Sequence, residues 1–304
     1  MDPEIRTETL TSCPICNSVV ILMLLEARDY ESNLGTYSIF RCSNCKVCFT
    51  NPRVIEEDIP RMYTENFGGV DIATSSNVSY ILKTLKIRGY SRKILKECHK
   101  KENLRVLDLG CGDGLIASHL SFNKLCASVV AADFSPEAPA IFKKHPIKNL
   151  CYIQYQKLFN DCTEKFDLIV LRHVLEHTIS PREFIRSAAS LLADNGTIVI
   201  EIPNIDTVWR NIFKGKYIQL DVPFHFFHFN KQSFYSTFGG DYNIKRFQYA
   251  SIPVLGPSLL NCFGLRVNRV GLMAIMFYPI QLVFNFIFQG YPAMLISLQN
   301  KSPD

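Results

Sequence analysis

The sequence has few of the features that mark a secreted protein or a protein that binds nucleic acid. It contains a single Trp, and its 33 Lys and Arg give a net charge of only +5 over 304 residues. It offers no clear surface of basic and aromatic residues on which bases would stack. Residues 1–11 are polar and partly acidic, which does not fit a signal peptide. Internal repeats and low-complexity segments are absent, so repeat architectures are not expected.

The 11 cysteines are an odd number, and most of them stand alone in apolar contexts. Disulfide frameworks are typical of shorter secreted chains, so we expect reduced thiols and a cytoplasmic protein. Hydrophobic residues make up 47% of the chain and charged residues 20%, which is enough apolar material for a large buried core. The basic stretches at 83–101 and 143–148 fit solvated helix faces, with attraction to phosphate groups as the alternative.

Apolar runs alternate with helical patterns through the middle of the chain. Strands are predicted at residues 104–109, 128–133, 150–154, 166–171 and 197–202. A helix is predicted at 181–192, and the Asp-Asn-Gly turn at 194–196 marks its end. Strands that alternate with helices predict a parallel, doubly wound α/β sheet.

The segment VLDLGCGDG at 106–114 lies where the first predicted strand turns into a helix. Glycine lets the backbone bend tightly and approach a ligand closely, and the start of a helix offers free N–H groups. Asp108 precedes the glycines, and Asp133 closes the next strand. An acid at the end of that strand can accept hydrogen bonds from two ribose hydroxyls. The pattern therefore predicts a site for a nucleoside-containing ligand.

This segment resembles motif I of the class I S-adenosylmethionine-dependent methyltransferases, and residues 132–136 resemble the acidic loop that follows it. Residues 166–169 and 191–200 are similar to the fourth and fifth strands of that family. The resemblance implies a Rossmann-like sheet of seven strands and S-adenosylmethionine as the cofactor. Another nucleotide-binding Rossmann domain is the alternative.

The same resemblance implies roles for single residues around the cofactor. It places Gly110, Gly112 and Gly114 beside the methionine part, and Asp108 near the amino group. It places Asp133 on the ribose and Phe134 against the adenine.

Two Cys-x-x-Cys pairs near the N-terminus predict a metal site. Cys13 and Cys16 form the first pair, and Cys42 and Cys45 form the second. Two tight turns that each present two thiolates suit tetrahedral zinc, and four sulfur ligands leave no open position, so the zinc is expected to be structural. A redox-active pair is the alternative. Cys48 is expected to be a small buried thiol.

Together with the segment FTNPR at 49–53, these pairs resemble the zinc-binding N-terminus of certain bacterial methyltransferases, which include sugar C-methyltransferases. The resemblance implies a zinc-ribbon-like module at 1–60 that helps form the substrate side of the cleft.

Two segments supply candidate residues for the acceptor side. Glu176 and His177 follow the fourth predicted strand, where the carboxyl ends of parallel strands line a ligand crevice. His225 and His228 lie among aromatic residues, and either could act as a general base, with His225 preferred. Helix capping or packing is the alternative role for Glu176 and His177, and a hydrogen-bonded place in an aromatic layer is the alternative for His225 and His228. No carboxylate follows the two later histidines at a ligand spacing, so they do not predict a metal site.

Residues 270–300 contain no charged residue. The last strand is predicted at 292–298, which makes the apolar helical segment at 255–290 an insertion before it. Three hypotheses for residues 270–289 remain open: a core or dimer helix, a helix in the membrane interface, and a spanning helix. Arg266 and Arg269 just upstream favour the interface.

The sequence therefore predicts a zinc-binding module at 1–60 and a methyltransferase domain at 75–304. We expect methyl transfer to a small molecule or glycan, with a sugar, a nucleotide-sugar or a lipid-linked saccharide favoured, on oxygen or on carbon. An RNA methyltransferase and a non-catalytic S-adenosylmethionine-binding scaffold are the alternatives. We expect a monomer or homodimer, either cytoplasmic or peripheral at the inner face of the membrane.

Overall fold

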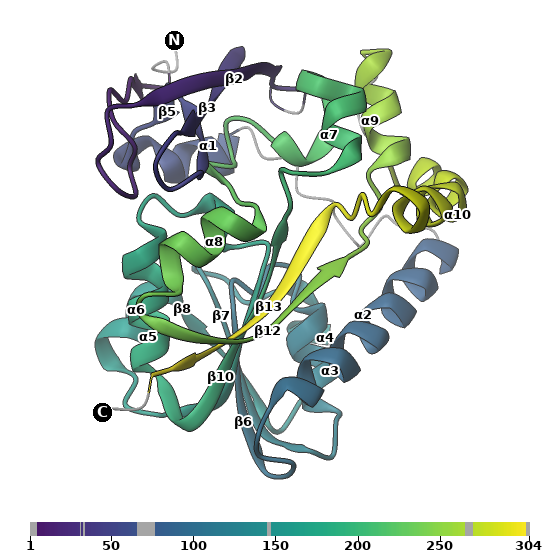
Figure 1. Cartoon of the computed structure of the whole chain (residues 1–304). Helices are drawn as coiled ribbons and strands as arrows, with labels where there is room; N and C mark the ends of the chain where they lie inside the picture. The colour runs from purple at the N-terminus through teal and green to yellow at the C-terminus, as the bar shows by residue number, and fades with distance from the viewer. Residues whose placement is uncertain are drawn as a thin grey trace.

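A mixed seven-stranded sheet forms the centre of the computed structural model, which describes residues 5–30, 32, 34–65, 77–144, 147–264 and 270–301 (Figure 1). The strand order is β12-β13-β10-β9-β6-β7-β8. The strands are β6 Leu104–Leu109, β7 Cys126–Asp133, β8 Leu150–Gln154, β9 Phe166–Arg172, β10 Leu192–Pro203, β12 Tyr242–Ala250 and β13 Ala293–Asn300. Within this sheet, β13 runs antiparallel to both of its neighbours. The prediction of a Rossmann-like sheet of seven strands is confirmed.

Helices cover both faces of this sheet (Figure 1). They are α2 Asn77–Glu97, α3 Leu115–Ser121, α4 Ala140–Lys144, α5 Tyr155–Asp161, α6 Pro181–Ser190 and α8 Lys231–Phe238. The central strands are buried at most positions and divide their apolar side chains between two cores. In β9, Leu168 and Val170 pack in one core, while Ile169 and Leu171 pack in the other. Alternation with a period of two therefore holds even where both faces are buried.

The structure differs from the sequence prediction between α6 and β10. The predicted helix ends at Ser190 rather than at 192, and the Asp-Asn-Gly segment lies within the span of β10. Leu192 already pairs with Phe166, and the register then shifts before Thr197. Asn195 has a φ of 58°, a left-handed conformation that asparagine tolerates. The turn residues thus form a bulge in a strand, not a loop after a helix.

A second sheet of four strands contains most of the N-terminal region, in the order β11-β4-β3-β2. Its strands are β2 Ile21–Arg28, β3 Thr36–Cys42, β4 Cys48–Asn51 and β11 Phe227–His228. The short strands β1 Thr7–Glu8 and β5 Arg53–Val54 pair with each other, and η1 Glu56–Asp58 and α1 Ile59–Glu65 follow. Strand β11 comes from far along the chain, so this sheet is completed by the part of the chain that also forms the seven-stranded sheet. The division into domains at 1–60 and 75–304 stays a prediction.

The apolar C-terminal segment forms α9 Leu255–Cys262 and α10 Val270–Phe288, which precede β13 as expected. These helices lie beside α7 Val208–Phe213, next to the N-terminal sheet (Figure 1). Among the described residues, no helix has the length and apolar character needed to cross a membrane. The positions of Arg266 and Arg269 fall outside the described residues.

Candidate functional site

The glycine loop joins β6 to α3 with three glycines in the left-handed region. Gly110, Gly112 and Gly114 have φ values of 81°, 51° and 74°. A Cβ at Gly110 would lie 2.3 Å from a methyl group of Val174, so only glycine fits there. A Cβ at Gly112 would meet nothing within 4 Å, so the backbone at the tip of the loop borders open space. The loop can therefore bring its N–H groups close to a ligand.

Asp133 at the end of β7 holds this loop directly. Its Oδ2 accepts a hydrogen bond of 2.7 Å from the backbone N–H of Gly112, and its Oδ1 accepts one of 2.8 Å from that of Phe134. Strands β6 and β7 are parallel neighbours, which is why their carboxyl ends bring the glycine loop and the acid together. Each carboxylate oxygen keeps further acceptor capacity for a ligand hydroxyl.

Asp108 lies beneath the loop, with 1% of its surface exposed. Its Oδ2 accepts a hydrogen bond of 3.1 Å from the backbone N–H of Ala117 in α3. Burial raises the pKa of Asp108 to about 7. The carboxyl group thus anchors α3 to the end of β6 from the inside.

Phe134 presents its ring to solvent beside the loop. The side chain is 56% exposed and stacks on Tyr155, with ring centroids 4.3 Å apart. Tyr155, at the start of α5, was not singled out in the sequence because it follows β8, a separate segment. An exposed aromatic ring backed by the partly buried Tyr155 lies next to a carboxylate that can bind ribose hydroxyls and to the open backbone at Gly112. This arrangement fits a nucleoside cofactor.

The four predicted cysteines meet in one cluster. One sulfur atom from each of Cys13, Cys16, Cys42 and Cys45 lies within 4.8 Å of the others. The Cys13–Cys45 and Cys16–Cys42 Sγ distances are 3.5 and 3.6 Å. A tetrahedral zinc with bonds of 2.3 Å would set its sulfurs about 3.8 Å apart. The donor set therefore fits zinc, and Cys48 stands outside it as a fully buried thiol whose pKa burial raises to about 12.

Backbone amides support the thiolate form of this cluster. The N–H groups of Ile15 and Asn44 point at Cys13 Sγ and Cys42 Sγ, at 3.4 and 3.3 Å. The hydrogen bond between Cys13 and Cys45 lowers the pKa of Cys13 to about 5 and raises that of Cys45. Thiolates are the form that binds a metal.

The candidate acceptor-side residues also come together. His177 and His225 lie edge to face with ring centroids 4.6 Å apart, and the centroid of His228 is 6.2 Å from that of His225. Glu176 Oε1 is 4.0 Å from His225 Nε2. Glu176, His225 and His228 are buried, with at most 5% of their surface exposed. Two segments far apart in sequence therefore form one cluster.

Glu176 is the negative charge at the centre of this cluster. Burial alone would raise its pKa, but the hydrogen bond from His173, at 3.0 Å, and the neighbouring histidines lower it to about 2. The Oε2 atom of Glu176 has no hydrogen-bond partner among the described residues, although it is buried. A buried acceptor without a donor is unfavourable and calls for an explanation.

The pKa values of the histidines around Glu176 are shifted in different directions. His173 lies in the left-handed region, with a φ of 53°; burial lowers its pKa, but hydrogen bonds to Glu176 and Glu201 outweigh burial and raise it. Burial lowers the pKa of His177 to about 4, that of His228 to about 3, and that of His225 as well. Neutral imidazoles near an ionised carboxylate can accept protons or bind a metal.

The N-terminal region contributes two residues to this cluster that sequence analysis did not assign to it. Thr50 Oγ1 lies 3.0 Å from His228 Nε2 and donates to the carbonyl of His225 at 2.6 Å. Tyr63 OH lies 2.9 Å from His177 Nδ1. The segment FTNPR contains Thr50, so the motif was visible, but its partner lies 178 positions away.

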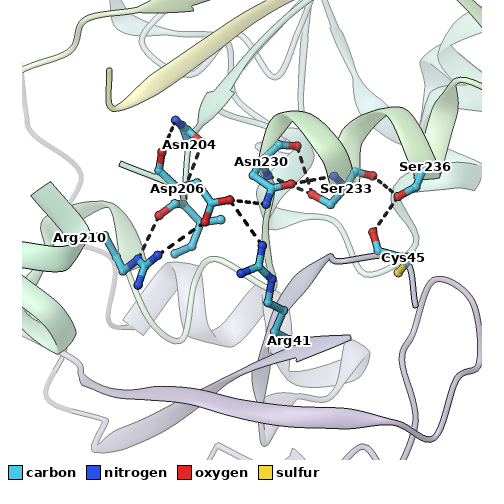
Figure 2. Close-up of polar contacts among 9 residues, drawn as sticks. Arg41, Cys45, Asn204, Asp206, Arg210, Asn230, Ser233 and Ser236 are labelled. Atoms are coloured by element: carbon cyan, nitrogen blue, oxygen red, sulfur yellow. Dashed lines mark hydrogen bonds and ion pairs between the residues drawn. The ribbon is translucent and has the colours of Figure 1, made fainter. Parts of the chain in front are cut away.

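A polar network joins the two parts of the molecule beside this cluster (Figure 2). Asp206, just after β10, accepts from Asn230 at 2.6 Å and from Arg41 of β3 at 3.4 Å, and pairs with Arg210 at 3.5 Å. Further along α8, Ser236 donates to the carbonyl of Cys45 at 2.7 Å, which ties the cysteine cluster to the body.

A pocket of about 470 Å³ opens over this network. Its lining includes Asn204, Asp206, Asn230, Lys231, Tyr235 and Tyr249. Amides, a carboxylate and two tyrosine rings can hydrogen-bond and pack against a hydroxyl-rich ligand.

Known proteins resemble the chain over this same region. The family model described as "methyltransferase domain" matches residues 83–240. The mitochondrial ubiquinone biosynthesis O-methyltransferase of Schizosaccharomyces pombe is 32% identical over 131 residues, which cover 41% of this chain and 47% of the relative. The ubiquinone biosynthesis O-methyltransferase of Pelagibacter ubique is 35% identical over 128 residues, covering 41% of this chain and 49% of the relative. The chain thus spans about half the length of the curated relatives it matches.

A solved structure from Bacillus halodurans C-125, assigned as a methyltransferase, superposes with a TM-score of 0.50. It is 14% identical and covers 70% of this chain and all of its own. At this identity the likeness concerns the fold alone.

We predict that Asp133→Ala weakens binding of S-adenosylmethionine roughly ten- to a hundredfold, because charge-assisted hydrogen bonds to the ribose and the support of Gly112 are both lost. Isothermal titration calorimetry measures the affinity. Asp194→Ala, at an exposed acid in the β10 bulge, is the matched control and should bind as the wild type does. Equal affinity of both variants would rule out the assignment of Asp133.

We predict that Cys42→Ser lowers the zinc content of the purified protein and its melting temperature, because the ion then loses one of four ligands. Metal analysis by mass spectrometry and thermal unfolding are the measurements. Cys48→Ser, outside the cluster, should keep the zinc. Zinc lost from Cys48→Ser but kept in Cys42→Ser would show that the ligand set is wrong.

Proposed function

Because the chain belongs to the methyltransferase domain family, we propose that it transfers a methyl group from S-adenosylmethionine to a small-molecule or glycan acceptor. The observation that carries this proposal is the hydrogen bond from the N–H of Gly112 to Asp133. It places a carboxylate that can bind ribose hydroxyls beside a glycine whose backbone borders open space. The sulfonium cofactor, when bound, supplies an electrophilic methyl group. The protein then has to hold the acceptor atom in line with that group.

In this proposal each residue around the loop contacts a different part of the cofactor. Gly110, Gly112 and Gly114 border the methionine part, and Asp133 binds the ribose hydroxyls. Phe134, with Tyr155 behind it, provides the surface on which the adenine lies. The carboxyl group of Asp108, at the end of β6, is buried beneath the loop. Asp108 is therefore proposed to lie below the position of the amino group.

We propose a hydroxyl-rich acceptor, such as a sugar, a nucleotide-sugar or a lipid-linked saccharide. The pocket beside Asp206 supports this class, because its amides, carboxylate and tyrosines suit a saccharide ring. The curated relatives are named as O-methyltransferases of ubiquinone biosynthesis. These names support oxygen as the acceptor atom, and a small molecule rather than a macromolecule as the acceptor.

For an acceptor that must lose a proton, His225 is the proposed base. Its Nδ1 lies 3.0 Å from the carbonyl of Gln219, so this nitrogen carries the hydrogen and Nε2 has the free lone pair. Burial lowers the pKa of His225, which keeps the ring neutral and able to accept a proton near neutral pH. Glu176 would stabilise the resulting imidazolium, with His177 and His228 packed around it.

The cysteine cluster is proposed to hold a structural zinc. Its four thiolates would close the coordination shell, so the ion would stabilise the N-terminal region rather than act on the acceptor. The hydrogen bond from the Ser236 hydroxyl to the carbonyl of Cys45 would connect this stabilised region to α8.

We also propose that α10 rests on a membrane surface. Its polar residues face inward: Gln281 accepts from the backbone N–H of Val254 at 2.8 Å, and Asn285 accepts from Trp209 at 2.7 Å. The exposed side chains of α10 are large and apolar, namely Met276, Ile280, Leu282, Val283, Phe284, Phe286, Ile287 and Phe288. Exposed apolar patches of this size mark interaction sites.

Charge supports a lipid surface over a second copy of the chain at this face. Lys214 and Lys216, on the turn η4 Lys214–Lys216 beside α9, are exposed, and residues 242–303 contain no Asp or Glu. Two copies docked through this face would bring the lysines of both copies together, and the segment that forms α9 and α10 supplies no acid to pair with them. An anionic bilayer would attract those lysines and receive the apolar side chains.

We predict that the protein, given S-adenosylmethionine and a panel of sugars, nucleotide-sugars and lipid-linked saccharides, methylates at least one of them. Mass spectrometry of the acceptor and release of S-adenosylhomocysteine are the measurements. His225→Asn should lower kcat by about 10² to 10⁴ with cofactor affinity unchanged. His99→Asn, at an exposed histidine, is the control and should keep full activity. Methylation of RNA but of no small molecule would contradict the proposal.

We predict that the protein sediments with vesicles of phosphatidylcholine and phosphatidylglycerol, and that Phe286→Glu abolishes this because it places a charge in the apolar face. Phe122→Glu, at a similarly exposed phenylalanine after α3, should still bind. A protein that stays in the supernatant at low salt, or a dimer that Phe286→Glu dissociates, would count against membrane contact.

A further inference from the structure

The cluster around Glu176 contains the donor set of a metal site. Glu176, His177 and His225 each place one possible ligand atom within 4.8 Å of the others. Glu176 and His177 belong to the turn η3 Leu175–His177 after β9, whereas His225 follows η5 Ile218–Leu220 and approaches from the other side. The ligands thus converge from two separately anchored segments.

An unpartnered atom points to a missing ligand at this place. Oε1 of Glu176 is paired with His173 Nδ1 at 3.0 Å, but Oε2 has no hydrogen-bond partner among the described residues. The side chain is 1% exposed, so bulk water does not reach this oxygen freely. A buried carboxylate oxygen is normally paired with a donor or bound to a metal.

The imidazoles are oriented as metal ligands are. Nδ1 of His225 lies 3.0 Å from the carbonyl of Gln219, and Nδ1 of His177 lies 3.0 Å from that of Phe224. A carbonyl only accepts, so the Nδ1 atoms that bond to these carbonyls carry hydrogen, and the Nε2 atoms of the neutral rings keep their lone pairs. The Tyr63 hydroxyl, 2.9 Å from His177 Nδ1, can accept from the same N–H. A backbone carbonyl that fixes the far nitrogen in this way is the usual outer partner of a metal-bound histidine.

Several acceptors face one another without a donor between them. Nε2 of His225 lies 4.0 Å from Glu176 Oε1 and 3.5 Å from Asp221 Oδ2. A lone pair directed at two carboxylates is repelled unless a cation lies between them. A divalent ion would satisfy all three groups at once, and small movements of the side chains would bring them to bonding distance.

We propose that Glu176, His177 and His225 bind a divalent transition-metal ion, with the Asp221 carboxylate beside the site and outside the ligand set. Two imidazoles and one carboxylate suit zinc, iron(II) or cobalt(II) rather than magnesium or calcium, which prefer oxygen ligands alone. This site is separate from the four-cysteine cluster and differs from it in having no sulfur ligand. Three protein ligands leave a coordination position open.

The use of the ion rests on the proposed function. An ion held there would make an acceptor hydroxyl at the open position more acidic, and the neighbouring Asp221 carboxylate, with 26% of its side chain exposed, would accept the proton. With the ion in place, the lone pair of His225 is donated to the metal. The ion then takes over the activation that a free His225 would provide by accepting the proton itself.

The test compares metal content in full-length variants dialysed against Zn²⁺ and separated from free ion by gel filtration. We expect His225→Asn to hold one zinc per chain less than the wild type. His228→Asn is the matched control: it removes a buried histidine of the same segment that is not among the three ligands, and should keep the wild-type content. Glu176→Gln is the second variant, and it should bind zinc at this site at least about tenfold more weakly.

Circular dichroism and thermal unfolding show that each variant is folded. Folded His225→Asn and Glu176→Gln with the wild-type zinc content would overturn the proposal, as would equal zinc loss from His228→Asn. Methyl transfer is measured separately. A protein that loses the second zinc as expected but methylates no acceptor would refute the proposed function and leave this metal site standing.

Discussion

The pairing of β11 with β4 is the interaction on which the buried cluster around Glu176 depends. Phe227 and His228 lie opposite Phe49 and Cys48 in the N-terminal sheet. The backbone N–H of Thr50 extends the contact to the carbonyl of Phe226, at 3.0 Å. The edge of a sheet has unpaired backbone groups that demand a partner, and the segment at 225–230 satisfies them. This pairing fixes the histidine segment above the carboxyl end of β9.

The consequence is a set of buried titratable groups that hold one another in place. Glu176 stays ionised in an apolar surrounding because His173 donates to it. His173 is held in turn near Glu201, at 3.5 Å, and Glu201 pairs with Arg172 at 3.3 Å. Charges buried in this way are costly unless they are paired. Their concentration at the end of β9 indicates a site kept for chemistry rather than for stability.

The C-terminal helix shows the reverse of the usual pattern. A surface helix normally turns its apolar residues inward, but α10 turns Gln281 and Asn285 toward the body and exposes large apolar residues such as Phe286 and Phe288. The inward amides satisfy the backbone of the segment before α9 and the indole N–H of Trp209. Polar residues that break up the apolar run in the sequence are therefore the residues that attach the helix.

The sequence alone determined the parts of this protein that depend on neighbours in the chain. The strand at 104–109, the glycines after it and the acid at the end of the next strand form a local pattern, because parallel neighbours in a βαβ unit end at the same edge. The paired cysteines are equally local, since each Cys-x-x-Cys is one turn. Tertiary structure decided the rest: the bulge at Asn195, the stacking of Tyr155 on Phe134, the contacts of Thr50 and Tyr63 with the histidines, and the approach of Glu176 to His225. These groups meet only because segments far apart in the sequence pack together. The spacing of residues along the chain does not predict contacts of this kind.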